Sequence, residues 1–294
     1  MRRDELLFVA KCDIVGQVRG KGFPATDLDA RRRKGVGWTH SNIMQTAFGP
    51  ILDTPFGTGG DLMIVPDPDA LVRVDFGDGS AVEHFALGDI RETGGAPWEC
   101  CPREFLRQGI AALAAQDGLQ LLAAFEHEFV YTGAEERPGH AYSLGAFRRQ
   151  GVFGEALCGA LQMAGVTPDS FLAEYGDRQY EYTVSPRLAL PAADQAVISR
   201  EMARAVAHRL GHRAIFSPMP VADGVGNGVH IHFSLQTKDR APAMRDPADA
   251  RFGLTDSARR FCAGVLHHLP ALCARTAAPR CASAPSSPPP TRRT

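Results

Sequence analysis

Two glutamates interrupt an otherwise apolar stretch at residues 119–131, which reads LQLLAAFEHEFVY. Such a stretch predicts a β-strand. Because alternate side chains of a strand point to opposite faces, Glu126 and Glu128 share one face, while Phe125 and His127 share the other. Two ionised carboxylates side by side in a sheet are costly unless something positive lies between them. Oxygen ligands suit Mg²⁺ or Mn²⁺, so the pair favours a divalent metal site; the alternative is a half-exposed strand with a solvated face.

A glycine-rich turn followed by two histidines forms the second unusual stretch, VADGVGNGVHIHFSL at residues 221–235. Its second half also predicts a strand, with His230 and His232 on one face and apolar residues on the other. The glycines allow a tight turn and the close approach of a ligand to the backbone. On this stretch alone, a hairpin that carries histidines on its polar face is an equally good interpretation.

Two further glutamates flank a predicted hairpin, with Glu174 before the turn at residues 176–178 and Glu181 after it. Taken singly, each is more often a surface carboxylate than a ligand. Together with the glutamate pair and the H-x-H motif they make a set of acids and imidazole that suits Mg²⁺ or Mn²⁺ better than Zn²⁺. Several carboxylates indicate two or more metal ions, an arrangement that holds nucleotide phosphates during phosphoryl transfer.

Composition and missing motifs exclude several other functions. The chain has 294 residues and a formal net charge of −1, without long charged runs, so no nucleic-acid surface is expected. No apolar run approaches the ~18 residues that a membrane-spanning helix needs, so no membrane association is expected. The phosphate-binding G-x-x-x-x-G-K-[ST] loop, the kinase glycine loop and the G-x-S-x-G motif are all missing from the sequence. Seven cysteines without C-x-x-C spacing favour reduced thiols and a cytoplasmic protein.

The chain divides into three parts by pattern, and its fold class is α+β. Residues 1–95 predict a small mixed domain with few helices, and residues 96–276 predict a domain of strands and helices. Residues 277–294 are rich in proline, serine and arginine and predict a disordered tail. Short strands are predicted at 61–66 and 70–76, a basic turn at 19–22, and helices at 102–117, 151–164, 192–210 and 254–273.

Seven segments of the chain, in matching order and spacing across residues 8–275, resemble the glutamine synthetase family, as a divergent, type I-like member. The segments are residues 12–24, 61–73, 97–113, 125–129, 173–197, 212–220 and 225–235. The resemblance implies an N-terminal β-grasp-like domain and a catalytic domain whose curved, mostly antiparallel sheet is backed by helices. It also implies homo-oligomeric rings, stacked in some members into dodecamers.

The same resemblance implies a reaction and a set of site residues. ATP would phosphorylate the γ-carboxylate of glutamate, and ammonia or an amine would then displace the phosphate. Glu128, Glu174 and Glu181 would hold a metal near the ammonia site, while Glu126 and His230 would hold the metal that bridges the ATP phosphates. Gly226 would contact glutamate through its backbone, and His232 and Ser234 would contact the nucleotide. The resemblance places no general base in this chain.

Departures from the family pattern leave the substrate open. Val225 stands where an asparagine is usual, Met219 where a lysine is usual, and Arg178 where a glycine is common. Such changes favour an amine other than ammonia, or a different acid. The alternatives are therefore a γ-glutamyl-amine or polyamine synthetase, or a catalytically inactive homologue.

The match fades after about Thr276, whereas family members continue and there supply a further glutamate ligand and substrate-binding arginines. We therefore expect a catalytic domain that is incomplete at its C-terminus, and a tail of the kind that a shifted reading frame produces.

Overall fold

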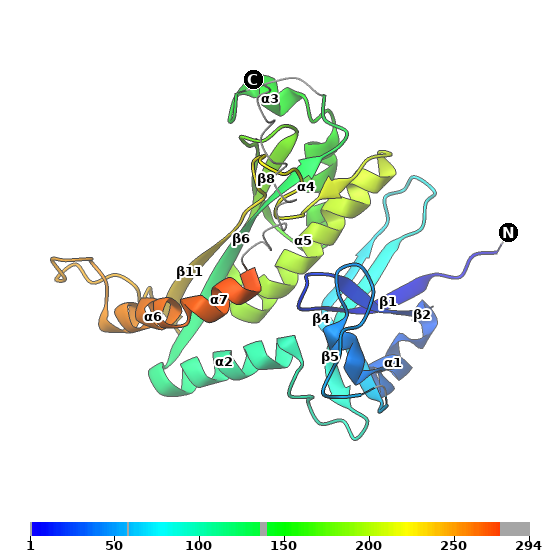
Figure 1. Cartoon of the computed structure of the whole chain (residues 1–294), viewed down its shortest axis with the longest axis horizontal. Coiled ribbons are helices and arrows are strands. Elements are labelled where there is room, and N and C mark those ends of the chain that lie inside the picture. Colours follow the sequence, from blue (N-terminus) through cyan, green and yellow to red (C-terminus); the bar gives the residue numbers. More distant parts are fainter. Residues whose placement is uncertain (1, 58, 136–139, 277–294) are drawn as a thin grey trace, which may run out of the picture.

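The chain builds two separate β-sheets in the computed structural model, which describes residues 2–57, 59–135 and 140–276 (Figure 1). The first sheet is mixed, with strand order β2-β1-β5-β4-β3, and β1 runs parallel to β5 while the other neighbours are antiparallel. Its strands are β1 (Leu6–Cys12), β2 (Val18–Pro24), β3 (Val36–Trp38), β4 (Leu62–Val74) and β5 (Glu83–Glu92). The connections hold η1 (Ala25–Asp27), α1 (Leu28–Lys34) and η2 (His40–Met44). This β-grasp-like arrangement agrees with the predicted N-terminal fold.

Three local predictions for this sheet were wrong or incomplete. The two short strands expected at 61–66 and 70–76 form one strand, β4, whose register shifts between Pro66 and Leu71. Residues 19–22 are not a turn, because they pair with β1 along β2. Strand β5 was not anticipated, since it lies at the centre of the sheet with its middle residues buried on both faces and shows no polar–apolar alternation.

The second sheet is centred on β6 (Leu119–Tyr131), the strand that carries the glutamate pair. On one side β6 pairs with β8 (Gln179–Val184) and β9 (Arg187–Leu188), and β7 (Pro168–Ala173) lies beyond β8. On its other side lie β10 (Ala214–Ile215) and β11 (Val229–Thr237). Every pairing in this sheet is antiparallel, as expected.

Helices cover the second sheet and join it to the first (Figure 1). They are α2 (Pro102–Asp117), α3 (Leu144–Arg148), α4 (Phe153–Met163), α5 (Ala189–Arg209), α6 (Asp256–His267) and α7 (Leu269–Thr276). The single helix predicted at 254–273 is two helices, because Pro270 lacks a backbone donor and fits only the first turn of a new helix. None of the described helices combines the length and the apolar character needed to cross a bilayer. The predicted tail at 277–294 lies outside the described residues.

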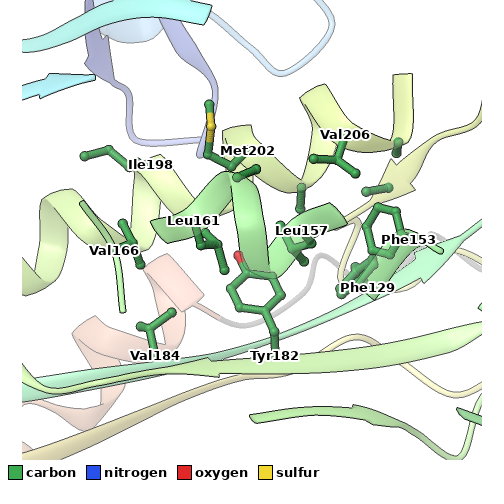
Figure 2. Packing of buried hydrophobic residues seen from close by; sticks show 14 of the residues in the cluster. Phe129, Phe153, Leu157, Leu161, Val166, Tyr182, Val184, Ile198, Met202 and Val206 are labelled. Carbon is green, nitrogen blue, oxygen red and sulfur yellow. The ribbon is translucent and has the colours of Figure 1, made fainter. Parts of the chain in front are cut away.

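A hydrophobic core fills the space between β6, β8, α4 and α5 (Figure 2). Phe129 and Tyr182 of the sheet pack with Leu157 of α4 and Met202 of α5, and all four are at most 1% exposed. Burying large apolar side chains on this face stabilises the sheet by roughly 1.5–3 kcal/mol for each. Because neighbouring residues of a strand alternate, the glutamates of β6 must point to the opposite face of the sheet.

Candidate active site

Strand register brings three of the predicted ligands together on the face away from the core. Glu126 of β6 lies directly opposite His230 of β11, and Glu128 lies directly opposite Glu181 of β8. One ligand atom from each of Glu126, Glu181 and His230 lies within 4.8 Å of the other two. The resemblance divides these residues between two metals, and that division stays a prediction.

Histidine and carboxylate are in direct contact within this group. His230 Nδ1 lies 3.1 Å from Glu126 Oε2, and His232 Nε2 lies 2.8 Å from Glu126 Oε1. The two histidines therefore share one face of β11, as their i, i+2 spacing predicted. His232 here contacts a proposed metal ligand, and its expected contact with a nucleotide stays a prediction, as does that of Ser234 in the same strand.

Four carboxylates gather at this site, and the ion-pair partners recorded for them among the described residues are the two histidines. Burial, together with the nearby charges of Glu126, Glu174 and Glu128, raises the pKa of Glu181 to about 7. Glu181 is only 7% exposed. Among the described residues, no lysine or arginine forms an ion pair with any of these four glutamates. Several carboxylates and one imidazole, with this surplus of negative charge, are a ligand set that suits Mg²⁺ or Mn²⁺.

Glu128 is held by the glycine-rich turn. The Gly228 amide donates to Glu128 Oε2 at 3.0 Å, and the Glu128 amide donates to the Gly228 carbonyl at 3.1 Å. Gln179 Nε2 donates to Glu128 Oε2 at 3.0 Å and to the Gly226 carbonyl at 2.8 Å. The turn and the carboxylate are thus fixed together, which positions Gly226, the predicted substrate contact, beside the acidic cluster.

Replacing Gly228 with alanine should disturb this clamp. A Cβ at this position would lie 2.7 Å from Glu128 Oε1, so the carboxylate must move. We expect a loss of at most about 1 kcal/mol in unfolding free energy, because the end of the Glu128 side chain can shift, and a smaller stabilisation by Mn²⁺, both measured by thermal unfolding. The matched control is Gly109→Ala, where an added Cβ meets open space on α2 and should stabilise by about 0.5–1 kcal/mol. An unchanged Mn²⁺ response in Gly228→Ala would contradict the clamp.

Two positioning residues escaped the sequence analysis. Asn227 Nδ2 donates to the Ile215 carbonyl at 3.1 Å and to the Ser217 carbonyl at 2.9 Å, which anchors the turn to the end of β10. Gln179 binds the same turn from β8. Neither residue belongs to a charged or metal-ligating type, and the one available signal was an asparagine between two glycines.

Glu174 lies just outside the three-residue group. Its Oε1 accepts a hydrogen bond from the Tyr142 hydroxyl at 3.0 Å, and its Oε2 accepts from the Tyr175 amide at 3.1 Å. The hydrogen bond to Glu174 is the main cause that raises the pKa of Tyr142 to about 12. Tyr142 carried no motif and could not have been identified from the sequence.

The positions that depart from the family pattern surround this site. Val225 is about half exposed in the glycine-rich turn, and Met219 has its methyl group near Gly226. Arg178 adopts a left-handed backbone conformation with φ +53°. That conformation suits glycine, which explains why a glycine is common at this place in the hairpin.

Comparisons with known proteins identify the family that this chain resembles. The sequence model of the glutamine synthetase N-terminal domain matches residues 2–98, and that of the glutamine synthetase catalytic domain matches residues 99–283. A gamma-glutamylpolyamine synthetase of Streptomyces coelicolor is 35% identical over 292 aligned residues, which cover 92% of this chain and 59% of that protein. A glutamine synthetase of Rhizobium leguminosarum bv. phaseoli is 29% identical, over 91% of this chain and 61% of its own length.

A solved structure shows the same fold. The crystal structure of a novel glutamine synthase homolog superposes with a TM-score of 0.88 at 41% identity, over 93% of this chain and 65% of that one. The present chain thus spans about three fifths of the length of the two relatives described above. Both sheets, the carboxylate-bearing face of β6 and the two sequence models lead to one assignment: the chain belongs to the glutamine synthetase family.

Proposed function

We propose that the protein is an ATP-dependent ligase that joins glutamate to ammonia through γ-glutamyl phosphate. The observation that carries this proposal is the convergence of Glu126, Glu181 and His230 within 4.8 Å, with Glu128 next to Glu181 in the register. Glutamine synthetases use ATP and a divalent metal. The acidic cluster supports the binding of Mg²⁺ or Mn²⁺, two or more in all, with ATP as a substrate.

The residues of this chain have separable tasks in the proposed reaction. Glu126 and His230 would hold one metal, and Glu128, Glu174 and Glu181 would hold another. Bound metal would neutralise the phosphates and polarise the transferred group. Gly226 would offer its backbone to glutamate, and Gln179 and Asn227 would keep that turn in place. His232 and Ser234 would contact the nucleotide from the exposed part of β11.

A second candidate function is the joining of glutamate to an alkylamine or polyamine. Val225 cannot form the hydrogen bond that an asparagine offers at this position, so the substrate pocket differs from that of an ordinary glutamine synthetase. The resemblance to a gamma-glutamylpolyamine synthetase supports the same alternative. Like glutamine synthetases in general, the protein would act as a homo-oligomer, and we place it in the cytoplasm.

An amine panel separates the two functions. Release of phosphate from ATP would be measured with glutamate and Mn²⁺ or Mg²⁺, using ammonia, methylamine, isopropylamine, putrescine or spermidine. Highest turnover with ammonia supports the first function, and highest turnover with an organic amine replaces it with the second. The Glu181→Gln variant should lower turnover by roughly 100-fold or more, while the exposed Glu99→Gln should not.

Binding must be measured beside turnover, because an inactive homologue is the third possibility. Thermal unfolding with Mn²⁺ and ATP reports whether the site binds its ligands. Stabilisation by both without any turnover would identify a binding-competent but inactive protein. No response to Mn²⁺ and ATP, together with no turnover on any amine, would refute the ligase assignment.

A further inference from the structure

A cavity of about 210 Å³ lies between the two domains, away from the acidic cluster. Its walls come from β1 and β5 of the first sheet and from α2 and α5, which lie beside that sheet in Figure 1. Leu87, Leu106, Val197 and Ala193 make most of the wall apolar. An apolar cavity of about 150 Å³ is large enough for benzene, so this one has room for a compact ligand of roughly six to ten non-hydrogen atoms.

Lys11 is the unusual member of the wall. It is only 3% exposed, although lysine is almost never fully buried unless it is paired. In the part of the chain that the structure describes, the Lys11 ammonium donates no hydrogen bond and forms no ion pair. Its Nζ lies over the ring of Trp38, 5.7 Å from the ring centre. Burial lowers the pKa of Lys11, against the attraction of Asp13.

The two carboxylates that line the same cavity are already engaged. Asp13 Oδ1 accepts from the amides of Val15 and Gln17, and its Oδ2 lies 2.6 Å from Arg19 Nε. Asp194 uses both oxygens for Arg103, at 2.9 and 2.6 Å. These acids are therefore committed to other partners.

The neighbouring thiol offers Lys11 no negative charge either. Burial raises the pKa of Cys12, which lines the cavity, so this thiol stays neutral. A lysine without an acidic partner in the wall of an apolar cavity is costly to bury, and a bound anion would supply the missing partner.

We propose that this cavity binds a small monocarboxylate with a compact apolar body, whose carboxylate pairs with Lys11 and whose body packs against Leu87, Leu106 and Val197. Arg103 also lines the cavity, but its guanidinium is already engaged by Asp194, Asp89 and Asp67. Because the walls belong to both domains, such a ligand would bridge them. The proposal concerns a site other than the acidic cluster and stands independently of the ligase reaction.

The test uses benzoate as the probe and thermal unfolding of the whole chain at pH 7. Benzoate should raise the unfolding midpoint in a saturable way, with Kd at or below about 1 mM. Benzyl alcohol, which has the same body without the charge, should bind at least tenfold more weakly. Sodium chloride at equal ionic strength is the control for a general salt effect.

Two variants and a matched control decide what Lys11 does. Lys11→Met should lose the preference for benzoate over benzyl alcohol, whereas Lys21→Met, an exposed lysine on β2, should keep it. Without ligand, Lys11→Met should be at least as stable as the natural chain, because a buried unpaired amine has been removed. Val197→Phe keeps Lys11 but fills the space, and should abolish the response to benzoate.

Three results would overturn the proposal. The first is equal affinity for benzoate and benzyl alcohol in the natural chain, or no saturable response to benzoate at 10-fold above the expected Kd. The second is unchanged benzoate affinity in Lys11→Met or in Val197→Phe. The third is a marked loss of stability in ligand-free Lys11→Met, since that would assign Lys11 a structural task within the fold.

Discussion

Replacing Arg103 with alanine should lower the free energy of unfolding by about 3–5 kcal/mol at pH 7, the largest effect expected of any single change outside the hydrophobic core. Arg103 lies in the first turn of α2, the helix between the two sheets, and its guanidinium contacts three carboxylates. It lies 2.6 Å from Asp194 of α5, 2.6 Å from Asp89 of β5 and 2.9 Å from Asp67 of β4. Burial alone would lower the pKa of Arg103, but its contacts with Asp194 and Asp89 raise it instead. The alanine variant leaves these three largely buried acids without their main partner.

Arg107 partly compensates for the loss of Arg103, so the loss of stability should arise mainly at Asp194. It contacts Asp67 at 3.2 Å and Asp89 at 2.7 Å, so these two acids keep a partner when Arg103 is lost. Asp194 keeps none of its recorded ion pairs, and burial already raises its pKa in the presence of Arg103. The double variant Arg103→Met with Asp194→Asn should therefore recover part of the lost stability, because it removes both charges together.

Denaturant unfolding measures this effect most directly. The control is Arg33→Ala, an exposed arginine of α1, which should change stability by no more than about 0.5 kcal/mol. A loss below about 1 kcal/mol in Arg103→Ala would show that the ion cluster does not hold the two domains together. Failure of the double variant to recover stability would show that Asp194 is not the critical partner.

The Glu181→Gln variant should have opposite effects on the metal-free and the metal-bound protein. The folded chain holds the pKa of Glu181 at about 7, above its ordinary value of 4.5. Protonated Glu181 therefore contributes stability that is complete below pH 4.5 and is lost as pH rises through 7. Glutamine resembles the protonated form, so without metal at pH 8 the variant should be more stable by on the order of 1–2 kcal/mol.

Mn²⁺ should reverse this order. The natural chain at pH 8 should gain a higher unfolding midpoint with Mn²⁺, and the variant should gain little, because an amide is a poor replacement for a charged ligand. Midpoints would be measured from pH 5 to pH 8 with and without Mn²⁺, with Glu99→Gln as the exposed control. A metal-free variant that is less stable than the natural chain at pH 8 would contradict the charge repulsion inferred at Glu181. An equal Mn²⁺ response would remove Glu181 from the ligand set.

Local pattern was enough to predict most of the elements that build the site. The apolar stretch at residues 119–131 predicted β6 and the shared face of its two glutamates, and the helix predicted at 102–117 is α2 with the same bounds. The i, i+2 spacing of His230 and His232 likewise predicted their common face. These features depend on neighbours in the sequence, which is why sequence analysis could identify them.

The rest depends on register and on contacts between distant segments. The grouping of Glu126 with Glu181 and His230 requires the alignment of three strands, which no local pattern specifies. Gln179 acts through an amide group, and nothing in its neighbourhood in the sequence marks it. The partners of Arg103 come from three different elements, so the charged cluster could be recognised only after the chain was folded.

One hydrophobic cluster contains residues of both segments that the family models match, residues 2–98 and 99–283. Val72 and Leu87 belong to the first segment, and they share one buried cluster with Phe129 and Met202 of the second. A cut between residues 98 and 99 would expose that cluster on both pieces. The two segments match separate sequence models but share one buried cluster, so neither is expected to fold without the other.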